Sequence, residues 1–470
     1  MADHPKPDAA NRLGTEPISR LLVRFSLPAV TGMLVNALYN VVDRIYVGQG
    51  VDVIALGGIS LVMPLMTISM ALAMLFGIGS ANMISMRLGQ GRREDAQKAL
   101  NHCLIMLALI GVTVMIIGYI FLEPILSLLG AQEDSAAINY ARSYYRIILY
   151  GSPLFMIGFG MSHCTRAQGF PTITMISMIL GAGLNIILDP IFIFALGWGV
   201  EGAAWATIIS QAASAVWIVS FSVGKKPVVK INLKEFKFRF DICGQIMAFG
   251  SSAFLLQLVM SAVQLLYNKS MGWYGPDALG VSNGGDIALS GMNIIGSITM
   301  LIMMPIFGIN QGAQPILGFN YGAKNYGRVL QTYVRAVAAA TIICTIGFIV
   351  GQLFPLAMIR AFTPDESPAL MLFAPWAMRV MLIMMPVNGF QVISSNFFVV
   401  TGRPKMSIFL SMLRQFLALI PCILIFGRYW GLWGVVAAAP VADGFSLILT
   451  GTMIAFELKK LKAASALQGT

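Results

Sequence analysis

The chain contains the stretch CLIMLALIGVTVMIIGYIFL at residues 103–122, which holds no charged side chain in twenty positions. A helix of about 20 apolar residues spans a hydrocarbon core about 30 Å thick. A second uncharged run occupies residues 336–354. Of the 470 residues, 57% are hydrophobic and 11% are charged, whereas soluble domains carry about 25% charged residues. The sequence therefore predicts a chain that consists mostly of membrane helices.

Apolar windows of this kind recur along the whole chain, separated by charged loops. Their approximate limits are residues 22–47, 54–84, 99–122, 138–161, 171–196, 201–223, 243–269, 287–317, 329–353, 368–399, 406–427 and 431–456. Helices are the expected spanning elements because they satisfy every backbone hydrogen bond internally. The predicted fold class is an all-α membrane protein with twelve transmembrane helices in two pseudo-symmetric six-helix lobes.

Loop charges predict the orientation. Basic residues gather in one set of loops, in the middle linker and at the C-terminus: Arg87, Arg92, Arg93, Lys98, Arg166, Lys225, Lys226, Lys230, Lys234, Lys237, Arg239, Lys324, Arg328, Arg403, Lys405, Lys459, Lys460 and Lys462. The alternate loops hold only Lys269, Arg360 and Arg428. Because basic loops stay inside, both termini are expected in the cytoplasm. This placement accounts for the net charge of +11 without a nucleic-acid partner, and no obligate protein partner is indicated.

The two halves of the chain resemble each other at a spacing of about 233 residues. Four residues of the first half, Arg146, Pro153, Gly169 and Pro171, recur at the same relative positions as Arg379, Pro386, Gly402 and Pro404. Two lobes of six helices cross the membrane in the same direction, so a pseudo-two-fold axis along the membrane normal and a central cavity are expected. The predicted segments are 1–21 (N-terminal, cytoplasmic), 22–223 (first lobe), 224–242 (cytoplasmic linker), 243–456 (second lobe) and 457–470 (C-terminal tail).

Ionisable groups inside a span are functional candidates because burying them in hydrocarbon costs at least about 2.5 kcal/mol. In the first window, Asn36, Tyr39 and Asp43 fall on one helical face and form a polar stripe. A functional role for Asp43 is the favoured interpretation. The alternative is that Asp43 lies near the outer end of the helix and reaches water.

A second acid lies in the fifth window. Asn185 precedes Asp189 by one turn, and Pro190 follows. Proline offers no N–H to the carbonyl of Ile186, which leaves a free acceptor beside the carboxylate. Carboxylate, amide and carbonyl oxygens suit a hard cation such as Na⁺, although Asp189 could instead stabilise the kink. If Asp43 and Asp189 meet, both cannot stay ionised cheaply, so the pair would hold a proton near neutral pH.

The second lobe is expected to offer no equivalent acid. It carries amides and hydroxyls that share helical faces and form a candidate substrate cavity, namely Gln257, Ser261, Gln264, Asn268, Asn388 and Gln391. Amide contacts between helices are the alternative interpretation. Three arginines lie within predicted spans, Arg146, Arg379 and Arg414. A structural role is favoured for them over contact with an anionic substrate.

The sequence resembles the multidrug and toxic compound extrusion (MATE) family. The resemblance rests on three segments, residues 36–48 (NALYNVVDRIYVG), 88–95 (LGQGRRED) and 168–190 (QGFP to NIILDP). It implies an antiporter in a bacterial inner membrane that exchanges amphiphilic, cationic compounds for H⁺ or Na⁺ and needs no cofactor. It also implies that Asp43, Asn185, Asp189 and Thr207 form the cation site in the first lobe.

Other functions remain as alternatives. A lipid-linked sugar flippase of the same superfamily would need cavity-facing cations, for which the three arginines are candidates. An intramembrane enzyme is not favoured because the sequence lacks a D-x-x-D pattern or histidine cluster at one interface. A major-facilitator antiporter usually carries an Asp-Arg pair in its second loop, where this chain has Arg92-Arg93 before Glu94-Asp95. A passive channel would not require paired acids beside a kink.

Overall fold

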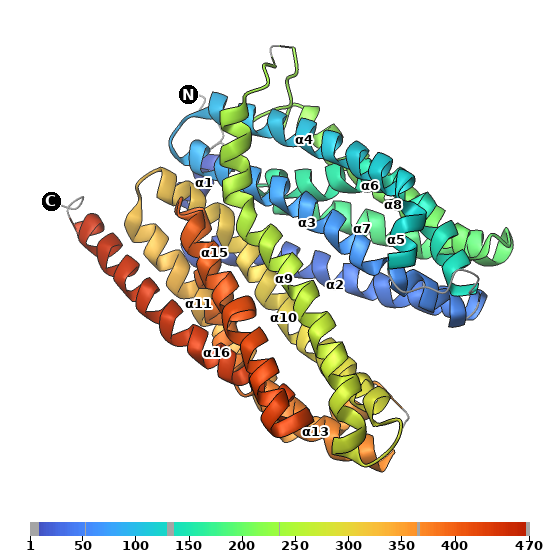
Figure 1. Ribbon diagram of the computed structural model, residues 1–470. Coiled ribbons are helices and arrows are strands. Elements are labelled where there is room, and N and C mark those ends of the chain that lie inside the picture. Colours follow the sequence, from blue (N-terminus) through green and yellow to red (C-terminus); the bar gives the residue numbers. More distant parts are fainter. Residues whose placement is uncertain (1–8, 52, 129–135, 235, 364–366, 467–470) are drawn as a thin grey trace, which may run out of the picture. The chain divides into compact units, whose positions relative to one another are not determined.

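The computed structural model describes residues 9–51, 53–128, 136–234, 236–363 and 367–466. The terminal segments expected at residues 1–21 and 457–470 therefore lie partly outside the described residues. All regular structure in the described chain is helical (Figure 1). The predicted all-α fold class is confirmed.

The helices follow the apolar windows with extensions into the charged loops. The first half contains α1 (Ala9–Thr15), α2 (Ile18–Gly50), α3 (Val53–Gly89), α4 (Arg93–Ile120), α5 (Leu122–Leu128), α6 (Ala136–Ala167), α7 (Pro171–Pro190), the π-helix η1 (Ile191–Ala195) and α8 (Gly199–Val223). The second half contains α9 (Phe240–Leu279), α10 (Gly284–Gly322), α11 (Tyr326–Leu353), α12 (Pro355–Arg360), α13 (Pro368–Leu382), α14 (Met385–Val400), α15 (Pro404–Met412), the π-helix η2 (Leu413–Leu419) and α16 (Ile420–Ala466).

The number of spans agrees with the predicted twelve. In the described chain, ten helices are long and apolar enough to cross a membrane, and α13 with α14 forms an eleventh span that is bent by 47°. The tenth of these helices, Pro404–Ala466, joins two segments across a kink at Gly431, where φ is 59°. Glycine adopts a positive φ at little cost, whereas other residues do so rarely. Dividing this helix at Gly431 gives twelve spans.

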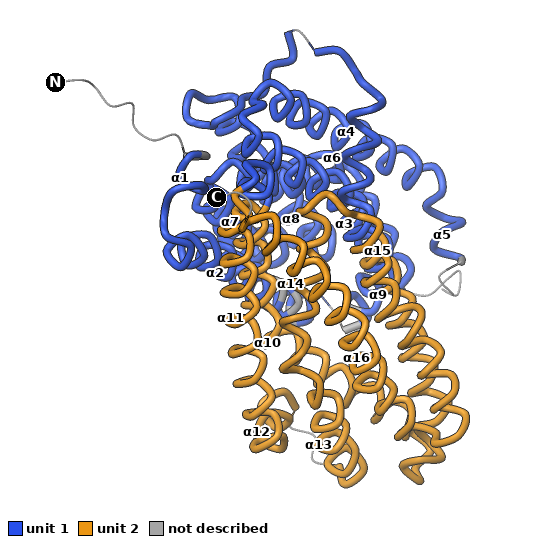
Figure 2. Tube along the Cα trace, turned by 90° about the vertical axis from the view of Figure 1, so that its left-hand side faces the viewer, with its two compact units in different colours: residues 1–254, 318–324 blue, residues 255–317, 325–470 orange. Residues whose placement is uncertain are grey.

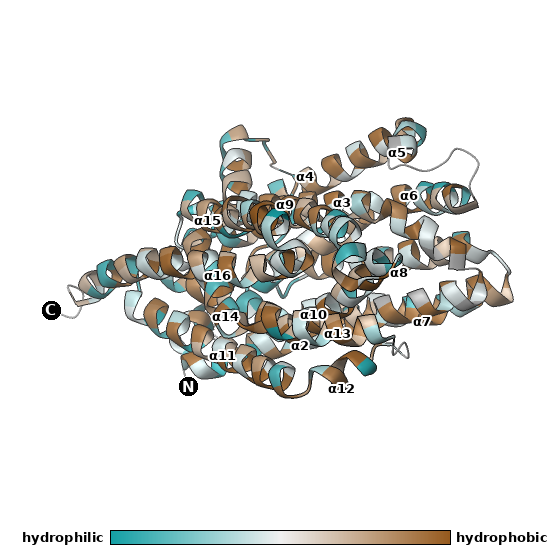
Figure 3. Ribbon diagram, turned by 60° about the horizontal axis from the view of Figure 1, so that its bottom comes forward, coloured by the Kyte–Doolittle hydropathy of each residue, from teal (hydrophilic) through white to brown (hydrophobic). Residues whose placement is uncertain are grey.

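Large apolar side chains are exposed along the spans. On α4, for example, Ile116, Ile117 and Ile120 are about half exposed or more. Figure 3 shows that apolar residues recur along most of the helices. Such surface would favour aggregation in water but suits contact with lipid chains. The chain is therefore a multi-pass membrane protein.

The described chain divides into two compact units (Figure 2). Unit 1 comprises residues 1–254 and 318–324, and unit 2 comprises residues 255–317 and 325–470. Within unit 1, α6 packs against α3, α4 and α8, while α7 packs against α2 and α8. Within unit 2, α14 packs against α11, and η2 packs against α16. The lobe boundaries expected from the sequence stay a prediction.

The linker after α8 is docked on unit 1 by side-chain hydrogen bonds. Asn101 of α4 bonds both the backbone N–H and the backbone carbonyl of Asn232, at 3.1 and 2.7 Å. His102 Nε2 accepts from the N–H of Arg239 at 2.9 Å, and Gln168 Oε1 accepts from the N–H of Val229 at 3.0 Å. These bonds satisfy backbone groups that an irregular segment cannot pair internally. The linker therefore has a fixed path.

Helix α3 and the beginning of α9 approach each other through glycines within unit 1. A Cβ atom on Gly79 would lie 2.1 Å from the carbonyl oxygen of Ile246, and one on Gly250 would lie 1.8 Å from that of Leu75. Neither position tolerates a side chain unless the helices move. Small residues permit such close backbone approach in membrane helices, so these glycines determine how closely α3 and α9 pack.

Candidate functional site: an acid cluster in unit 1

The candidate site of unit 1 is built from α2, α6, α7 and α8, which pack against one another as described above. Asp189, near the end of α7, is fully buried, and Asn185 one turn earlier is 1% exposed. The Asn185 amide donates to Asp189 Oδ1 at 3.1 Å. The helical spacing of the two residues thus places them on one buried face, as the sequence predicted.

The second acid comes from α2. The carboxyl group of Asp43 lies within hydrogen-bonding reach of the Asp189 carboxyl group. Tyr39, one turn before Asp43, is close enough to both acids to interact with their charges. Asn36, the third member of the predicted polar stripe, has an exposed side chain. The structure therefore brings Tyr39, Asp43, Asn185 and Asp189 together.

Tyr144 and Thr207 complete the cluster from α6 and α8. The two side chains share a hydrogen bond, and Tyr144 also lies near Asp43, Tyr39 and Asp189. Thr207 had been assigned only through the family resemblance, and sequence reasoning missed Tyr144 altogether. The only available signal was its position in an apolar window, which it shares with several other tyrosines.

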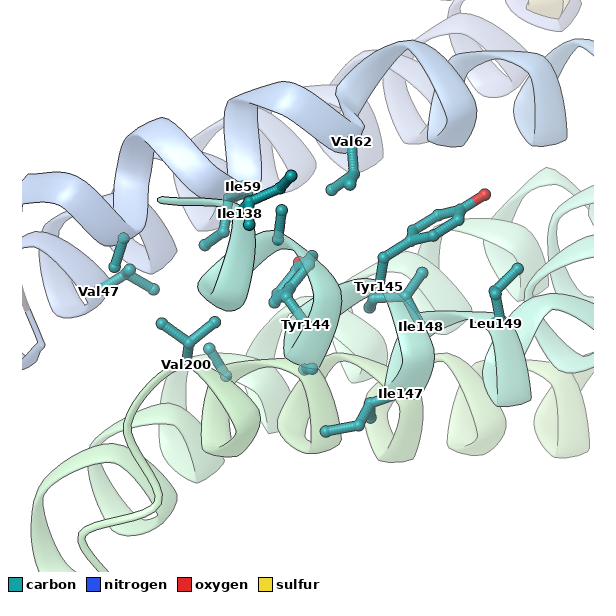
Figure 4. Close-up of a cluster of buried hydrophobic side chains, with 14 of the residues drawn as sticks. Val47, Ile59, Val62, Ile138, Tyr144, Tyr145, Ile147, Ile148, Leu149 and Val200 are labelled. Carbon is teal, nitrogen blue, oxygen red and sulfur yellow. The ribbon is translucent and has the colours of Figure 1, made fainter. Parts of the chain in front are cut away.

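The ring of Tyr144 is held by an apolar cluster that also includes Val47, Ile59, Ile148 and Val200. Figure 4 shows Tyr144 among these side chains. Tyr144 is 4% exposed. Because its ring is fixed by packing, its hydroxyl group has a defined position beside the acids. The apolar surroundings also keep the local dielectric low, which strengthens every charge interaction in the cluster.

The cluster contains more hydrogen-bond acceptors than donors. Asp189 Oδ2 and Asn185 Oδ1 are buried and accept no hydrogen bond from a donor among the described residues. The neighbour of Asp189 is another carboxyl group, that of Asp43. Two carboxylates in contact repel strongly in a low dielectric unless a proton or a cation lies between them. The arrangement is therefore chemically suited to binding H⁺ or a small hard cation.

The helix changes form directly beside the cluster. After Pro190 the backbone continues as the π-helix η1, in which the N–H of Leu196 donates to the carbonyl of Ile191 at 2.9 Å. Proline cannot supply the N–H of a regular α-helical bond, and one-turn π-helices occur frequently at functional sites. The backbone thus changes helix type directly after Pro190, and the free carbonyl of Ile186 expected beside Asp189 stays a prediction.

The predicted polar residues of the second half fall into two groups. On α9, Ser261 donates to the carbonyl of Gln257 at 3.2 Å, and the Gln264 amide donates to Asn268 at 3.0 Å. The side chains of Gln264 and Asn268 are exposed. On α14, by contrast, Asn388 and Gln391 are 7% and 5% exposed. Their role as a substrate cavity stays a prediction.

Unit 2 contains a buried acid that the sequence analysis did not single out. Asp443 of α16 is 8% exposed and pairs with Arg414 of η2 at 2.7 Å between Oδ1 and Nε. The Gln391 amide donates to the backbone carbonyl of Asp443 at 2.9 Å. Asp443 lies in the apolar window 431–456, and its partner lies 29 residues away.

The other two span arginines have different surroundings. Arg146 is about half exposed and forms an ion pair with Glu123 at 3.5 Å. Glu123 also accepts hydrogen bonds from Arg142 at 2.7 and 2.9 Å, which hold the pKa of its carboxyl group below the usual range. The backbone carbonyl of Arg379 accepts from the Gln352 amide at 2.8 Å. Arg146 is thus paired with an acid outside its own helix, and the structural role favoured from the sequence stays a prediction.

Comparison with known proteins gives consistent matches along the chain. A family model described as MatE matches residues 28–191 and 253–424. The multidrug export protein MepA of Staphylococcus aureus (strain MRSA252) is 27% identical over 431 residues, which cover 91% of each chain. MepA of Staphylococcus haemolyticus (strain JCSC1435) is 25% identical over 439 residues, or 93% of this chain and 92% of the relative.

Solved structures agree with this result. An outward-facing multidrug resistance MATE family transporter of the MOP superfamily superposes with a TM-score of 0.89 at 28% identity, covering 97% of this chain and 100% of the other. A MOP superfamily transporter from Pyrococcus furiosus, described as having a binding pocket of reverse polarity, gives a TM-score of 0.89 at 28% identity and covers 97% and 99%.

Proposed function

The chain belongs to the MatE family, and from this membership and the paired acids of unit 1 we propose that it exports amphiphilic cations in exchange for H⁺ or Na⁺. The family and its relatives make the chain a membrane transporter for multidrug efflux and not an enzyme. The exchange and the charge of the substrate are the proposal.

The observation that supports the exchange is the contact between Asp43 and Asp189. With a proton or Na⁺ bound, the two carboxyl groups can remain together in a low dielectric. Without it, their repulsion favours an arrangement that separates or hydrates them. A ligand can shift a conformational equilibrium only by its different affinities for the two states, and the acid pair supplies such a difference.

The remaining cluster residues have supporting roles in this proposal. Asn185 orients Asp189 through its amide and offers its own oxygen to the cation. Thr207 and Tyr144 contribute hydroxyl groups whose positions are fixed by their shared hydrogen bond. Asn185, Thr207 and the two acids thus form an oxygen-rich set appropriate for Na⁺, while the acids alone suffice for a proton.

Drug efflux from proteoliposomes tests the proposal. Purified protein is reconstituted with a cationic dye, and a proton gradient or a sodium gradient is imposed in separate arms. Wild-type protein is expected to respond to one of the two gradients. The Asp43→Asn and Asp189→Asn variants are expected to lose that gradient-driven component, because an amide cannot exchange a proton or neutralise Na⁺. Full gradient-driven transport by both variants would exclude the proposal.

A matched variant controls for the loss of an acid as such. Asp241→Asn makes the same chemical change at the beginning of α9, where the carboxylate is about half exposed and pairs with Arg239. This variant is expected to retain wild-type efflux. Loss of coupling by Asp241→Asn to the same extent would mean that the assay does not report on the acid cluster.

The location of the chain is proposed on the same basis. A bacterial inner membrane with both termini in the cytoplasm is supported by the bacterial relatives and by the loop charges. Small amphiphilic substrates and membrane lipid are the proposed partners. The flippase alternative is not favoured, because the relatives are multidrug export proteins and Arg146 is paired with an acid.

A further inference from the structure

A second charged site lies inside unit 2, on helices distinct from those of the acid cluster. Arg414 of η2 and Asp443 of α16 form an ion pair whose side chains are 26% and 11% exposed. Arg414 follows the beginning of its span at Pro404 by ten residues, and Asp443 follows the kink at Gly431 by twelve. At about 1.5 Å per residue, both groups lie roughly 15–18 Å from a span end, near the middle of the membrane.

Three buried polar groups around this pair have unused hydrogen-bonding capacity. Among the described residues, no partner satisfies Tyr267 Oη, Asn388 Oδ1 or Gln391 Oε1. Their side chains are at least nine-tenths buried, at 9%, 7% and 5% exposure. Gln391 bonds the backbone of Asp443, Tyr267 lies near enough to interact with the Asp443 charge, and Asn388 is one helical turn before Gln391.

A purely structural ion pair in hydrocarbon would be expected to have its surroundings satisfied, because each unmet buried group costs about 1–3 kcal/mol. Here the only ion pair of Arg414 in the described chain joins its Nε to Asp443. The guanidinium group has four further N–H donors on its two terminal nitrogens. Arg414 also lies in a π-helical segment, a feature that occurs frequently at functional sites. This combination indicates a ligand site.

The charge of the site restricts what it can bind. The pair is neutral as a whole, whereas the cluster in unit 1 contains two acids and suits a cation. A ligand with only a cationic group would occupy Asp443 and leave Arg414 without a counter-charge in a low dielectric. A ligand that carries a cationic group and a carboxylate replaces one ion pair by two and leaves no charge unmatched. Arg414 can also hold a carboxylate through two parallel hydrogen bonds.

We propose that Arg414 and Asp443, with Tyr267, Asn388 and Gln391, form a recognition site for amphiphiles that carry one cationic group and one carboxylate. The ligand carboxylate binds Arg414, and its cationic group binds Asp443. The tyrosine hydroxyl donates to the carboxylate, and the two amide oxygens accept from the cationic group. This inference rests on the proposed function, because it assigns a substrate class to the transporter.

Two dyes that differ at one group test the assignment. Rhodamine 110 carries a carboxylate beside its delocalised cation, and rhodamine 123 is its methyl ester and carries only the cation. Binding of each dye to the purified full chain in detergent is measured by fluorescence polarisation. No ion gradient is applied, so the result does not depend on the acid cluster in unit 1, and failure of the exchange mechanism would appear only in the efflux assay.

The variant for this test is Arg414→Gln combined with Asp443→Asn, which removes both charges and leaves neither buried alone. Charge-assisted hydrogen bonds contribute enough that rhodamine 110 binding is expected to weaken by about tenfold or more. Rhodamine 123 binding is expected to stay within about twofold of wild type, which also shows that the variant is folded. Arg414→Lys, which keeps the charge, is expected to retain part of the rhodamine 110 affinity.

The opposite results are equally specific. If the double variant weakens the binding of both dyes by the same factor, or the binding of neither, the ion pair does not recognise the carboxylate. If wild-type protein does not bind rhodamine 110, the assignment of this substrate class is also wrong.

Discussion

Replacing Gly250 by alanine is expected to destabilise unit 1, because the new methyl group has no room. Its Cβ atom would lie 1.8 Å from the carbonyl oxygen of Leu75, whereas ordinary contact begins at 3.4 Å, so α3 and α9 must separate by about 1.6 Å. Overpacking costs about 1–3 kcal/mol. Because the clashing atom belongs to the backbone and cannot rotate aside as a side chain can, the cost of overpacking here is expected to be about 3 kcal/mol. Alanine favours the helix by about 1 kcal/mol relative to glycine. The free energy of unfolding is therefore expected to fall by about 2 kcal/mol.

The loss is measurable as a lower midpoint of thermal unfolding. For a unit of about 260 residues, an unfolding entropy of about 2.1 cal/mol/K per residue converts 2 kcal/mol into a shift of about 4 °C. Cys103, Cys164 and Cys243 are buried free thiols of this unit. A thiol-reactive fluorophore therefore reports unfolding directly in detergent.

Gly244→Ala is the matched control on the same helix. A Cβ atom at Gly244 meets no atom within 4 Å. This variant is expected to melt at or slightly above the wild-type temperature, because only the helix-propensity gain remains. If Gly250→Ala melts at or above Gly244→Ala, the close crossing of α3 and α9 does not exist as described.

Three further predictions concern individual polar contacts. Arg403→Gln is expected to lower the free energy of unfolding by about 3 kcal/mol, because it leaves Glu457, which is 3% exposed, without its ion-pair partner. Equal melting temperatures of Arg403→Gln and the neighbouring Lys405→Gln variant would contradict this. Asn101→Ala removes both hydrogen bonds to Asn232 and is expected to speed tryptic cleavage of residues 225–239, whereas Gln97→Ala on the same helix should leave the rate unchanged. Because Arg142 holds the pKa of Glu123 below its ordinary value of 4.5, the Arg142→Gln variant should melt below wild type at about pH 7. The difference should shrink as the pH falls through the lowered pKa of Glu123, because the protonated carboxyl group no longer pairs with Arg142. A difference that does not change with pH would show that the ion pair is not its cause.

The fold was predictable because each span is specified locally. Uncharged runs such as residues 103–122 can satisfy their backbone only as helices, and their lengths match a bilayer. The break at Gly431 was also predictable, since Gly431 is the first residue of the apolar window 431–456, which follows the window 406–427. The helix ends were less predictable. For example, α9 begins at Phe240, three residues before the expected limit, because amphipathic flanks continue a helix without adding hydrophobicity.

The candidate site was predictable in part. The relation of Asn185 to Asp189 follows from helix geometry, and so does that of Tyr39 to Asp43. The meeting of Asp43 with Asp189 depends on how α2 packs against α7, which no residue spacing specifies. Tyr144 reaches the acids only because α6 crosses the same region. Contacts between helices depend on side-chain packing, so sequence periodicity on each helix gave no sign of this tyrosine.

Asp443 shows why an acid can be overlooked in an apolar window. A hydropathy window weighs each side chain alone, and one acid among residues such as Val435, Val436 and Ala438 hardly changes its mean. The physical penalty for that acid is removed by Arg414, which lies on another segment of the chain. The two charges are each costly in a membrane and are inexpensive only together. An unexplained acid and an unexplained base on neighbouring spans should therefore be considered as one pair, and here that pairing changes unit 2 from a neutral lining into a charged site.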